Sequence, residues 1–127
     1  MAQIEIPDAW RREVAATLAT EATDRLIEWK TDAERRYEAD AAAAKTRAGD
    51  VEPAWRYEVY RPFRDFLLSL HPTGCPVTME TPPGETCEFY FPFLGERFYG
   101  KILLRPDRKR VVIFSAHRPL KRSLSCE

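Results

Sequence analysis

The spacing of apolar residues divides the chain into a helical first half and a strand-rich second half. Between Asp8 and Ala48, apolar residues recur at steps of three and four, which is typical of one face of a helix. They are Trp10, Val14, Leu18, Ala22, Leu26, Trp29, Ala33, Tyr37 and Ala41. Asp8 and Gly49 are residue types that begin and end helices. The pattern predicts a helical segment over residues 8–48.

This segment has two interpretations. The stretch "TDAE" at residues 31–34 matches a helix-starting capping box, which favours two helices that meet near residue 30. An unbroken helix of about 40 residues would be about 60 Å long, more than one small domain covers. In that case its outer half is expected to pack on a second copy of the chain, as a homodimer, or on a partner protein.

A second, shorter helix is predicted after the turn "GDVEP" and a short strand in "AWRYEVY". In "RPFRDFLLSLHP", Phe63, Phe66, Leu67 and Leu70 follow helical spacing, and Pro62 suits a first helical turn. The prediction is a helix over residues 62–71.

From Cys75 onward, Pro and Gly separate short runs of strand-forming residues. The runs are "PVTME", "TCEFYFPF", "ERFYGKILLR" and "KRVVIFSAH". They predict an antiparallel meander of three to four strands over residues 76–118, followed by a basic tail at 119–127. We therefore expect a single α+β domain over residues 1–127, with the helices packed on one face of the sheet.

The positive charge is concentrated at the end of the chain. The whole chain has a net charge of zero, but the segment from Arg97 onward holds 9 basic and 2 acidic residues. A surface of this kind favours RNA, a nucleoprotein or an acidic protein surface as the partner. The residues expected to contact that partner are Arg97, Arg105, Arg108, Lys109, Arg110, Arg118, Lys121 and Arg122.

Other classes of protein receive little support. No apolar run approaches the roughly 18 residues that cross a bilayer, and the first residues do not resemble a signal peptide. We expect no membrane contact and a cytoplasmic location, bacterial or in a phage-infected host. The odd number of cysteines without paired spacing favours reduced thiols. A zinc site formed by His71, Cys75, Cys87 and Cys126 lacks the usual spacing, so we expect no metal and no cofactor.

The last two predicted strands carry the candidate chemistry. Alternation in "ERFYGKILLR" places Arg97, Tyr99, Lys101 and Arg105 on an open side, and Phe98, Gly100, Ile102 and Leu104 on a core side. Gly100 indicates that a helix or an aromatic ring approaches the strand closely there.

The register of the final hairpin decides where His117 points. If Leu104 pairs with Arg110 around five loop residues, Ile113, Ser115 and His117 lie beside Lys101 and Tyr99. If Arg105 pairs with Arg110 around four residues, Phe114, Ala116 and Arg118 lie there, and His117 faces the core. The sequence allows both registers.

In the first register, His117, Lys101, Tyr99 and Ser115 form a candidate catalytic set. A base and an acid that move protons, together with cations that stabilise a charged phosphorane, suffice for metal-independent cleavage of a phosphodiester in RNA.

The stretch "ERFYGKILLRPDRKRVVIFSAH" resembles the end of RelE- and MqsR-type bacterial ribonuclease toxins. The resemblance implies helices packed on a curved antiparallel sheet whose basic and aromatic residues contact RNA. It implies the same role for Tyr99, Lys101, Ser115 and His117.

Two functions remain as hypotheses. The first is a toxin-like protein that acts on RNA through the basic hairpin. The alternative is a non-catalytic interaction protein, such as a phage- or plasmid-encoded inhibitor or an assembly subunit, which binds a partner through the basic face and the long helix. The chain contains no Gly-rich phosphate loop, G-x-S-x-G or H-E-x-x-H motif to indicate another reaction.

Overall fold

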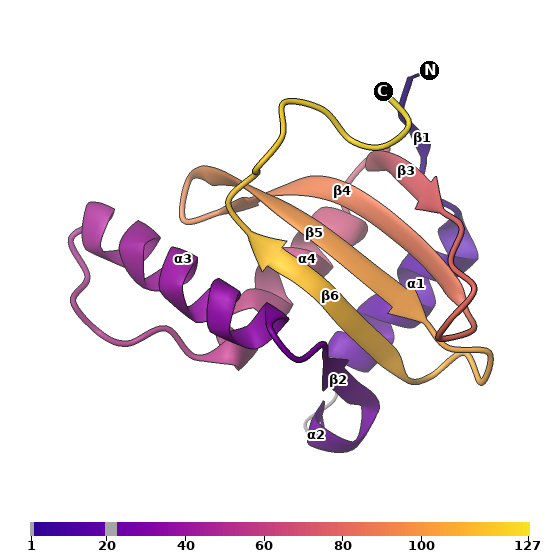
Figure 1. Cartoon of the computed structure of the whole chain (residues 1–127), viewed down its shortest axis with the longest axis horizontal. Helices are drawn as coiled ribbons and strands as arrows, with labels where there is room; N and C mark the ends of the chain where they lie inside the picture. Colours follow the sequence, from indigo (N-terminus) through magenta and orange to yellow (C-terminus); the bar gives the residue numbers. More distant parts are fainter. Residues whose placement is uncertain (1, 20–22) are drawn as a thin grey trace.

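The computed structural model describes residues 2–19 and 23–127 and has an α+β architecture (Figure 1). The helical elements are α1 (Asp8–Leu18), α2 (Thr23–Leu26), α3 (Ala33–Arg47), the 3-10 helix η1 (Arg56–Val59) and α4 (Tyr60–Leu67). The strands are β1 (Ile4–Glu5), β2 (Ile27–Trp29), β3 (Thr73–Val77), β4 (Glu85–Phe93), β5 (Glu96–Leu104) and β6 (Val111–His117).

The strands of the described residues form one mixed sheet of six strands, in the order β1-β3-β4-β5-β6-β2. Strands β3 to β6 are the antiparallel meander that the sequence predicts. The prediction of three to four strands was incomplete, because β1 pairs antiparallel with β3 and β2 pairs parallel with β6. Both added strands are three residues or shorter, and pairing with an existing sheet edge is what makes such short segments extended.

The first half of the chain is not one long helix. Helix α1 ends at Leu18, the chain is extended in β2, and α3 begins at Ala33 within the predicted capping box. The continuous helix was therefore wrong. The interpretation with a break is confirmed only in part, because a helix does begin near residue 30, but the first helix ends at Leu18 and does not meet it. Ala22 of the predicted apolar stripe lies outside the described residues.

Splitting the segment lets both of its apolar stripes reach the same sheet. Trp10 and Val14 of α1 are buried, as are Tyr37 and Ala41 of α3. Helix α1 packs beside α4, and α3 packs along β6, so the chain itself covers the face that was expected to bind a partner. The described helices include none long and apolar enough to cross a membrane.

In the middle of the chain, helical structure begins at Arg56, before the predicted start at residue 62. The strand predicted in "AWRYEVY" was wrong, because these residues form η1 and the start of α4. The predicted second helix is present, but it begins at Tyr60 and ends at Leu67. Leu70 therefore lies beyond the helix, where its side chain is 87% exposed.

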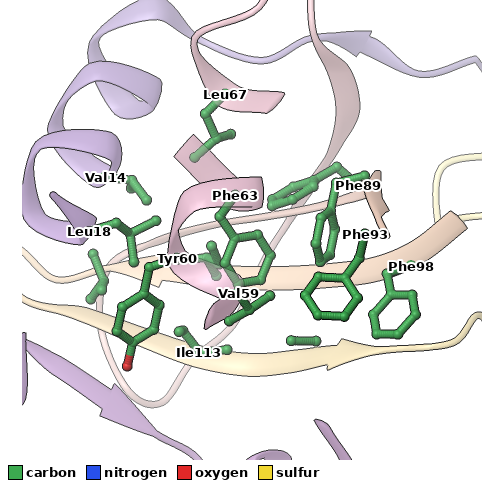
Figure 2. Close-up of a cluster of buried hydrophobic side chains, with 14 of the residues drawn as sticks. Val14, Leu18, Val59, Tyr60, Phe63, Leu67, Phe89, Phe93, Phe98 and Ile113 are labelled. Atoms are coloured by element: carbon green, nitrogen blue, oxygen red, sulfur yellow. The ribbon is translucent and has the colours of Figure 1, made fainter. Parts of the chain in front are cut away.

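Aromatic rings from α4 and the central strands fill the core (Figure 2). The Phe63 ring lies 4.4 Å from that of Phe91 and 5.9 Å from that of Phe89, measured between centroids. A Cβ atom at Gly100 would lie 2.8 Å from ring atoms of both Phe63 and Phe89. The expected close approach of an aromatic ring to Gly100 is confirmed.

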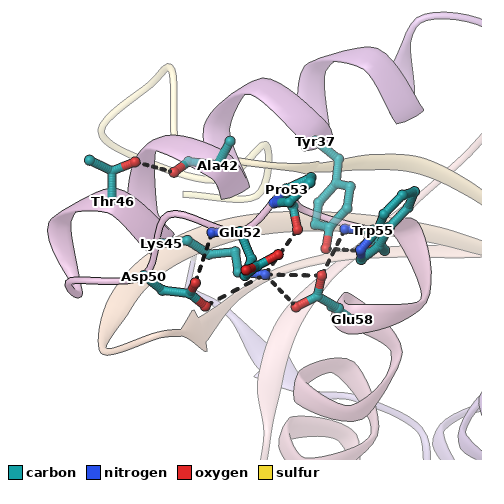
Figure 3. Close-up of polar contacts among 9 residues, drawn as sticks. All are labelled: Tyr37, Ala42, Lys45, Thr46, Asp50, Glu52, Pro53, Trp55 and Glu58. Carbon is teal, nitrogen blue, oxygen red and sulfur yellow. Dashed lines mark hydrogen bonds and ion pairs between the residues drawn. The ribbon is translucent and has the colours of Figure 1, made fainter.

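A buried lysine fixes the end of α3 to the loop before η1 (Figure 3). Lys45 is 6% exposed, and its Nζ donates to Glu58 Oε2 at 2.9 Å and to the Pro53 carbonyl oxygen at 3.0 Å. Glu58 also accepts the backbone N–H of Trp55 at 2.8 Å. Tyr37 donates its hydroxyl to the Trp55 carbonyl, and burial raises the pKa of Tyr37. This paired and hydrogen-bonded cluster has a structural role, since a buried charge is tolerated when its partners are in place.

Candidate nucleic-acid interface on the open sheet face

A β-bulge brings the four predicted catalytic residues onto one face of the sheet. Near the turn, Leu104 pairs with Val111, and Arg105 N–H donates to the Arg110 carbonyl at 2.9 Å, which is the register of the four-residue loop. Between Lys101 and Ile102 the register shifts. Phe114 is then the extra residue, because Ile113 opposes Ile102 and Ser115 opposes Lys101.

Beyond the bulge, the side chains at the end of β6 point to the opposite face of the sheet from the one that the turn register would give them. His117 opposes Tyr99 and Ser115 opposes Lys101, so these four residues share the face opposite to α1 and α4. The five-residue loop required for this convergence was wrong, but the convergence itself is present. We call this side of the sheet the open face.

Tyr99 is hydrogen-bonded to a buried carboxylate. Its hydroxyl donates to Glu88 Oε2 at 2.5 Å, and the side chain of Glu88 lies on the neighbouring strand β4. Burial and the adjacent Glu88 raise the pKa of Tyr99 well above 10.0. Tyr99 is therefore protonated at neutral pH, where it acts as a hydrogen-bond donor and not as a base.

Glu88 is only 5% exposed. Burial alone would raise its pKa, but hydrogen bonds from Ser125 and Tyr99 and the nearby Lys101 ammonium outweigh burial. The net result is a pKa below the ordinary 4.5. Glu88 thus connects β5 to the end of the chain, because its Oε1 accepts the backbone N–H of Ser125.

His117 is 7% exposed, and its ring lies 5.4 Å from that of Tyr99 between centroids. Its Nδ1 lies 2.7 Å from the carbonyl oxygen of Arg118. A carbonyl oxygen only accepts, so Nδ1 carries the proton of the neutral ring and Nε2 is the free basic nitrogen.

The last ten residues, 118–127, cross this end of the open face, and we call them the strap (Figure 1). Between the strap and the sheet lies a pocket of about 450 Å³. Glu88, Tyr90, Tyr99 and His117 line it from the sheet, and Pro119, Leu120, Lys121, Ser123, Leu124, Ser125 and Glu127 line it from the strap.

A disulfide between Cys75 of β3 and Cys126 fastens the strap. The expectation of reduced thiols was therefore wrong for these two cysteines, which are 51 residues apart in a sequence that gives no spacing signal. Cys87 is a buried free thiol. Within residues 2–19 and 23–127, no group of three or more His, Cys, Asp and Glu side chains is arranged to hold a metal ion.

Beyond the strap, the open face pairs aromatic rings with cations. The ammonium groups of Lys101 and Lys30 lie 5.6 Å and 5.9 Å from the centroid of Phe114. On the other side of the pocket, the guanidinium of Arg97 lies 4.9 Å from the centroid of Tyr90. We call Phe114, Lys30 and Lys101 the stacking platform.

The basic turn between β5 and β6 is neutralised within the chain. Arg105 pairs with Glu28 at 2.5 Å, and Arg110 pairs with Asp107 at 2.7 Å. Arg108 pairs with both Glu13 and Glu85. These three arginines were expected to contact the partner, but their charges are already matched.

The remaining predicted cations are more exposed. Lys109 is exposed on the turn, where its backbone N–H donates to Asp107 Oδ1 at 2.9 Å. Arg118, Lys121 and Arg122 are exposed on the strap, and the backbone N–H of Arg118 donates to Asp40 at 3.0 Å. Among the predicted contact residues, the structure therefore places the exposed positive charge on the strap, at Arg97 and at Lys109. The two lysines of the stacking platform add to it.

Glu88, Lys30, Phe114 and Tyr90 are residues of this face that the sequence analysis did not select. Glu88 interrupts an otherwise apolar strand, and a carboxylate at such a position indicates that it has a hydrogen-bond partner inside the fold. Phe114 gains its position from a bulge, and Lys30 from the parallel pairing of β2, neither of which has a signature in the sequence.

Comparisons of this chain with protein-family models, curated proteins and solved structures give no match, so the face is interpreted from its own chemistry.

Proposed function

We propose that the protein binds single-stranded RNA across the open face of its sheet. The observation that carries this proposal is the stacking platform, in which two lysine ammonium groups lie against the ring of Phe114. An aromatic ring stacks on a base, and the adjacent cations bind the flanking phosphates.

The geometry favours single strands over duplexes. Bases reach an aromatic ring on a sheet only when they are unstacked from one another. Tyr90 with Arg97 supplies a second pair of the same kind across the sheet from Phe114, so the face can hold more than one nucleotide. The resemblance of the hairpin to RelE- and MqsR-type toxins supports the same assignment, with the cytoplasm as the place of action.

Metal-independent cleavage of the bound strand is a second candidate function. It is favoured by the tautomer of His117, whose free Nε2 would take the proton of a ribose 2′-hydroxyl. The 2′-oxygen would then attack the phosphorus, Lys101 would stabilise the charge that develops, and the leaving 5′-oxygen would take a proton from water. Tyr99 would position the imidazole and take no part as a base.

A binding titration tests the main proposal. Fluorescence anisotropy is measured with a labelled 12-nucleotide single-stranded RNA and with the duplex of the same sequence, over a range of salt concentrations. We expect tighter binding of the single strand and an affinity that falls as salt rises. Equal affinity for both, or no binding at low salt while a protein partner is bound, would contradict the proposal and favour the interaction protein.

A further inference from the structure

We propose that the disulfide between Cys75 and Cys126 is a redox-responsive latch, and that its reduction by a dithiol releases the strap from the pocket that holds Glu88, Tyr99 and His117. The opening of the strap is independent of the proposed function. The effect of opening on RNA rests on that function.

The strap has few other attachments to the sheet. Among the described contacts, the side chain of Leu124 is buried to 4% exposure, and the backbone N–H of Ser125 donates to Glu88. The strap segment that precedes Leu124 is exposed at Lys121, Arg122 and Ser123. Arg118, at the start of the strap, is also held, because its carbonyl oxygen lies 2.7 Å from His117 Nδ1 and its backbone N–H donates to Asp40 at 3.0 Å. Beyond Arg118, the disulfide supplies the covalent part of a closure that is otherwise made by Leu124 and the hydrogen bond from Ser125 to Glu88.

The two sulfur atoms differ in their surroundings. Cys75 is fully buried in β3, where it opposes Glu88, whereas Cys126 is only half-buried. A reductant that approaches from solvent consequently reaches the sulfur of Cys126 first.

The reduction balances as a two-electron exchange with a dithiol. One thiolate of the reductant attacks Sγ of Cys126, the bond between the two protein sulfurs breaks, and its electron pair leaves on Cys75, which takes up a proton. The second thiolate attacks the resulting mixed disulfide, releases Cys126 as a thiol and closes the disulfide of the reductant. Proton uptake by Cys75 is favoured, since its thiolate would be buried beside a charged carboxylate.

Release changes both the access to the pocket and the charge above it. Seven strap residues form one wall of the pocket, so their departure exposes His117 and Tyr99 to solvent. Lys121 and Arg122 then become mobile cations beside the stacking platform. The oxidised protein is thus a restrained form and the reduced protein an open form of the same face.

The latch is tested first without RNA. Hydrogen exchange of the amides of 118–127 and carbethoxylation of His117 are measured for the oxidised protein, the dithiol-treated protein and Cys126→Ser. His71, whose side chain is 70% exposed and paired with Glu5, is the internal reference, and Cys87→Ser is the matched control variant. We expect His117 to react about tenfold faster in the reduced protein and in Cys126→Ser, within the usual range of coupling between two sites.

In the same samples we expect the rate at His71 to stay constant and Cys87→Ser to behave as the oxidised wild type. Unchanged reactivity of His117 after complete reduction, verified by mass spectrometry, would overturn the latch.

The single-stranded RNA titration is then repeated on the oxidised and reduced forms. Tighter binding after reduction supports gating of the face. Faster strap exchange with unchanged RNA affinity overturns gating, and no RNA binding in either form refutes the proposed function while leaving the measured opening in place.

Discussion

Tyr99 and His117 face each other across β5 and β6, with their ring centroids 5.4 Å apart, because Phe114 forms a bulge between them and the turn. Without this extra residue, the short loop register would turn His117 toward the core. The same bulge places the ring of Phe114 near the ammonium groups of Lys30 and Lys101. One irregularity of the hairpin therefore accounts for both the pocket and the stacking platform.

Replacing the ring of Phe114 is expected to weaken RNA binding. Phe114→Leu keeps an apolar side chain but loses the stacking surface, which contributes about 1–3 kcal/mol per base. We expect a loss of affinity of about tenfold in the anisotropy titration, with little change in the midpoint of urea denaturation. Phe114→Tyr is the matched control and should bind nearly as wild type. Equal loss in both variants would show that the ring does not stack on a base.

Removing the imidazole of His117 is expected to abolish cleavage and spare binding. His117→Gln keeps a side chain of similar length and removes the basic nitrogen, so we expect the rate of single-stranded RNA cleavage to fall by at least about 100-fold. Gel analysis of end-labelled RNA measures the rate, and His71→Gln is the control. Cleavage retained in His117→Gln would exclude this residue as the base.

The charge of Glu88 makes stability depend on pH. Its folded pKa lies below the ordinary 4.5, so its contribution to the free energy of unfolding is full above about pH 4.5 and is lost as pH falls through the folded pKa. Glu88→Gln is expected to lower the free energy of unfolding by about 1–3 kcal/mol at pH 7, because the N–H of Ser125 and the hydroxyl of Tyr99 lose a charged acceptor.

Urea denaturation of both proteins between pH 7 and pH 3 checks this expectation. The difference between wild type and Glu88→Gln should shrink at the acid end. Glu85→Gln, which removes an exposed ion pair to Arg108, should change stability by less than about 1 kcal/mol. A difference for Glu88→Gln that is constant down to pH 3 would mean that the carboxylate is not stabilised in its charged form.

Gly100→Ala is expected to destabilise the core through contact with Phe63 and Phe89. The added Cβ would lie 2.8 Å from atoms of both rings, and overpacking of this kind costs about 1–3 kcal/mol. Urea denaturation measures the loss, and Phe63→Leu in the Gly100→Ala background should recover part of it.

Gly95→Ala is the comparison for this variant. Its Cβ would meet nothing within 4 Å, but its φ of +77° is unfavourable for alanine. Phe63→Leu should therefore give no recovery in the Gly95→Ala background. Recovery in both backgrounds would contradict a steric cause at Gly100.

The sequence predicts those parts of the fold whose patterns are local. Alternation in β5 separates Lys101 from Ile102, and helical spacing identifies Phe63 and Leu67 as buried. The mixed sheet depends on pairing between distant segments, as when Ile27 opposes Val111, and no local pattern records that pairing. The long helix was overestimated because its alanine-rich sequence is compatible with a helix at nearly every position.

In the candidate site, too, the features set by local patterns were predicted and those set by distant contacts were not. Tyr99, Lys101, Ser115 and His117 were selected from alternation, and the structure brings them together. The basic turn was overestimated, because the acidic partners of Arg105 and Arg108 lie in α1, β2 and β4, far away in sequence. Charge counted along a chain does not show which charges are already paired in space.

The claim that the open face binds RNA is tested most directly by a salt titration of two charge variants. Lys101→Gln removes a cation of the stacking platform, whereas Arg110→Gln removes a cation that is already paired with Asp107. We expect Lys101→Gln to weaken the binding of single-stranded RNA and to lower the slope of log affinity against log salt by about one, whereas Arg110→Gln should leave both unchanged. Equal effects of the two variants, or a larger effect of Arg110→Gln, would contradict RNA binding by the open face.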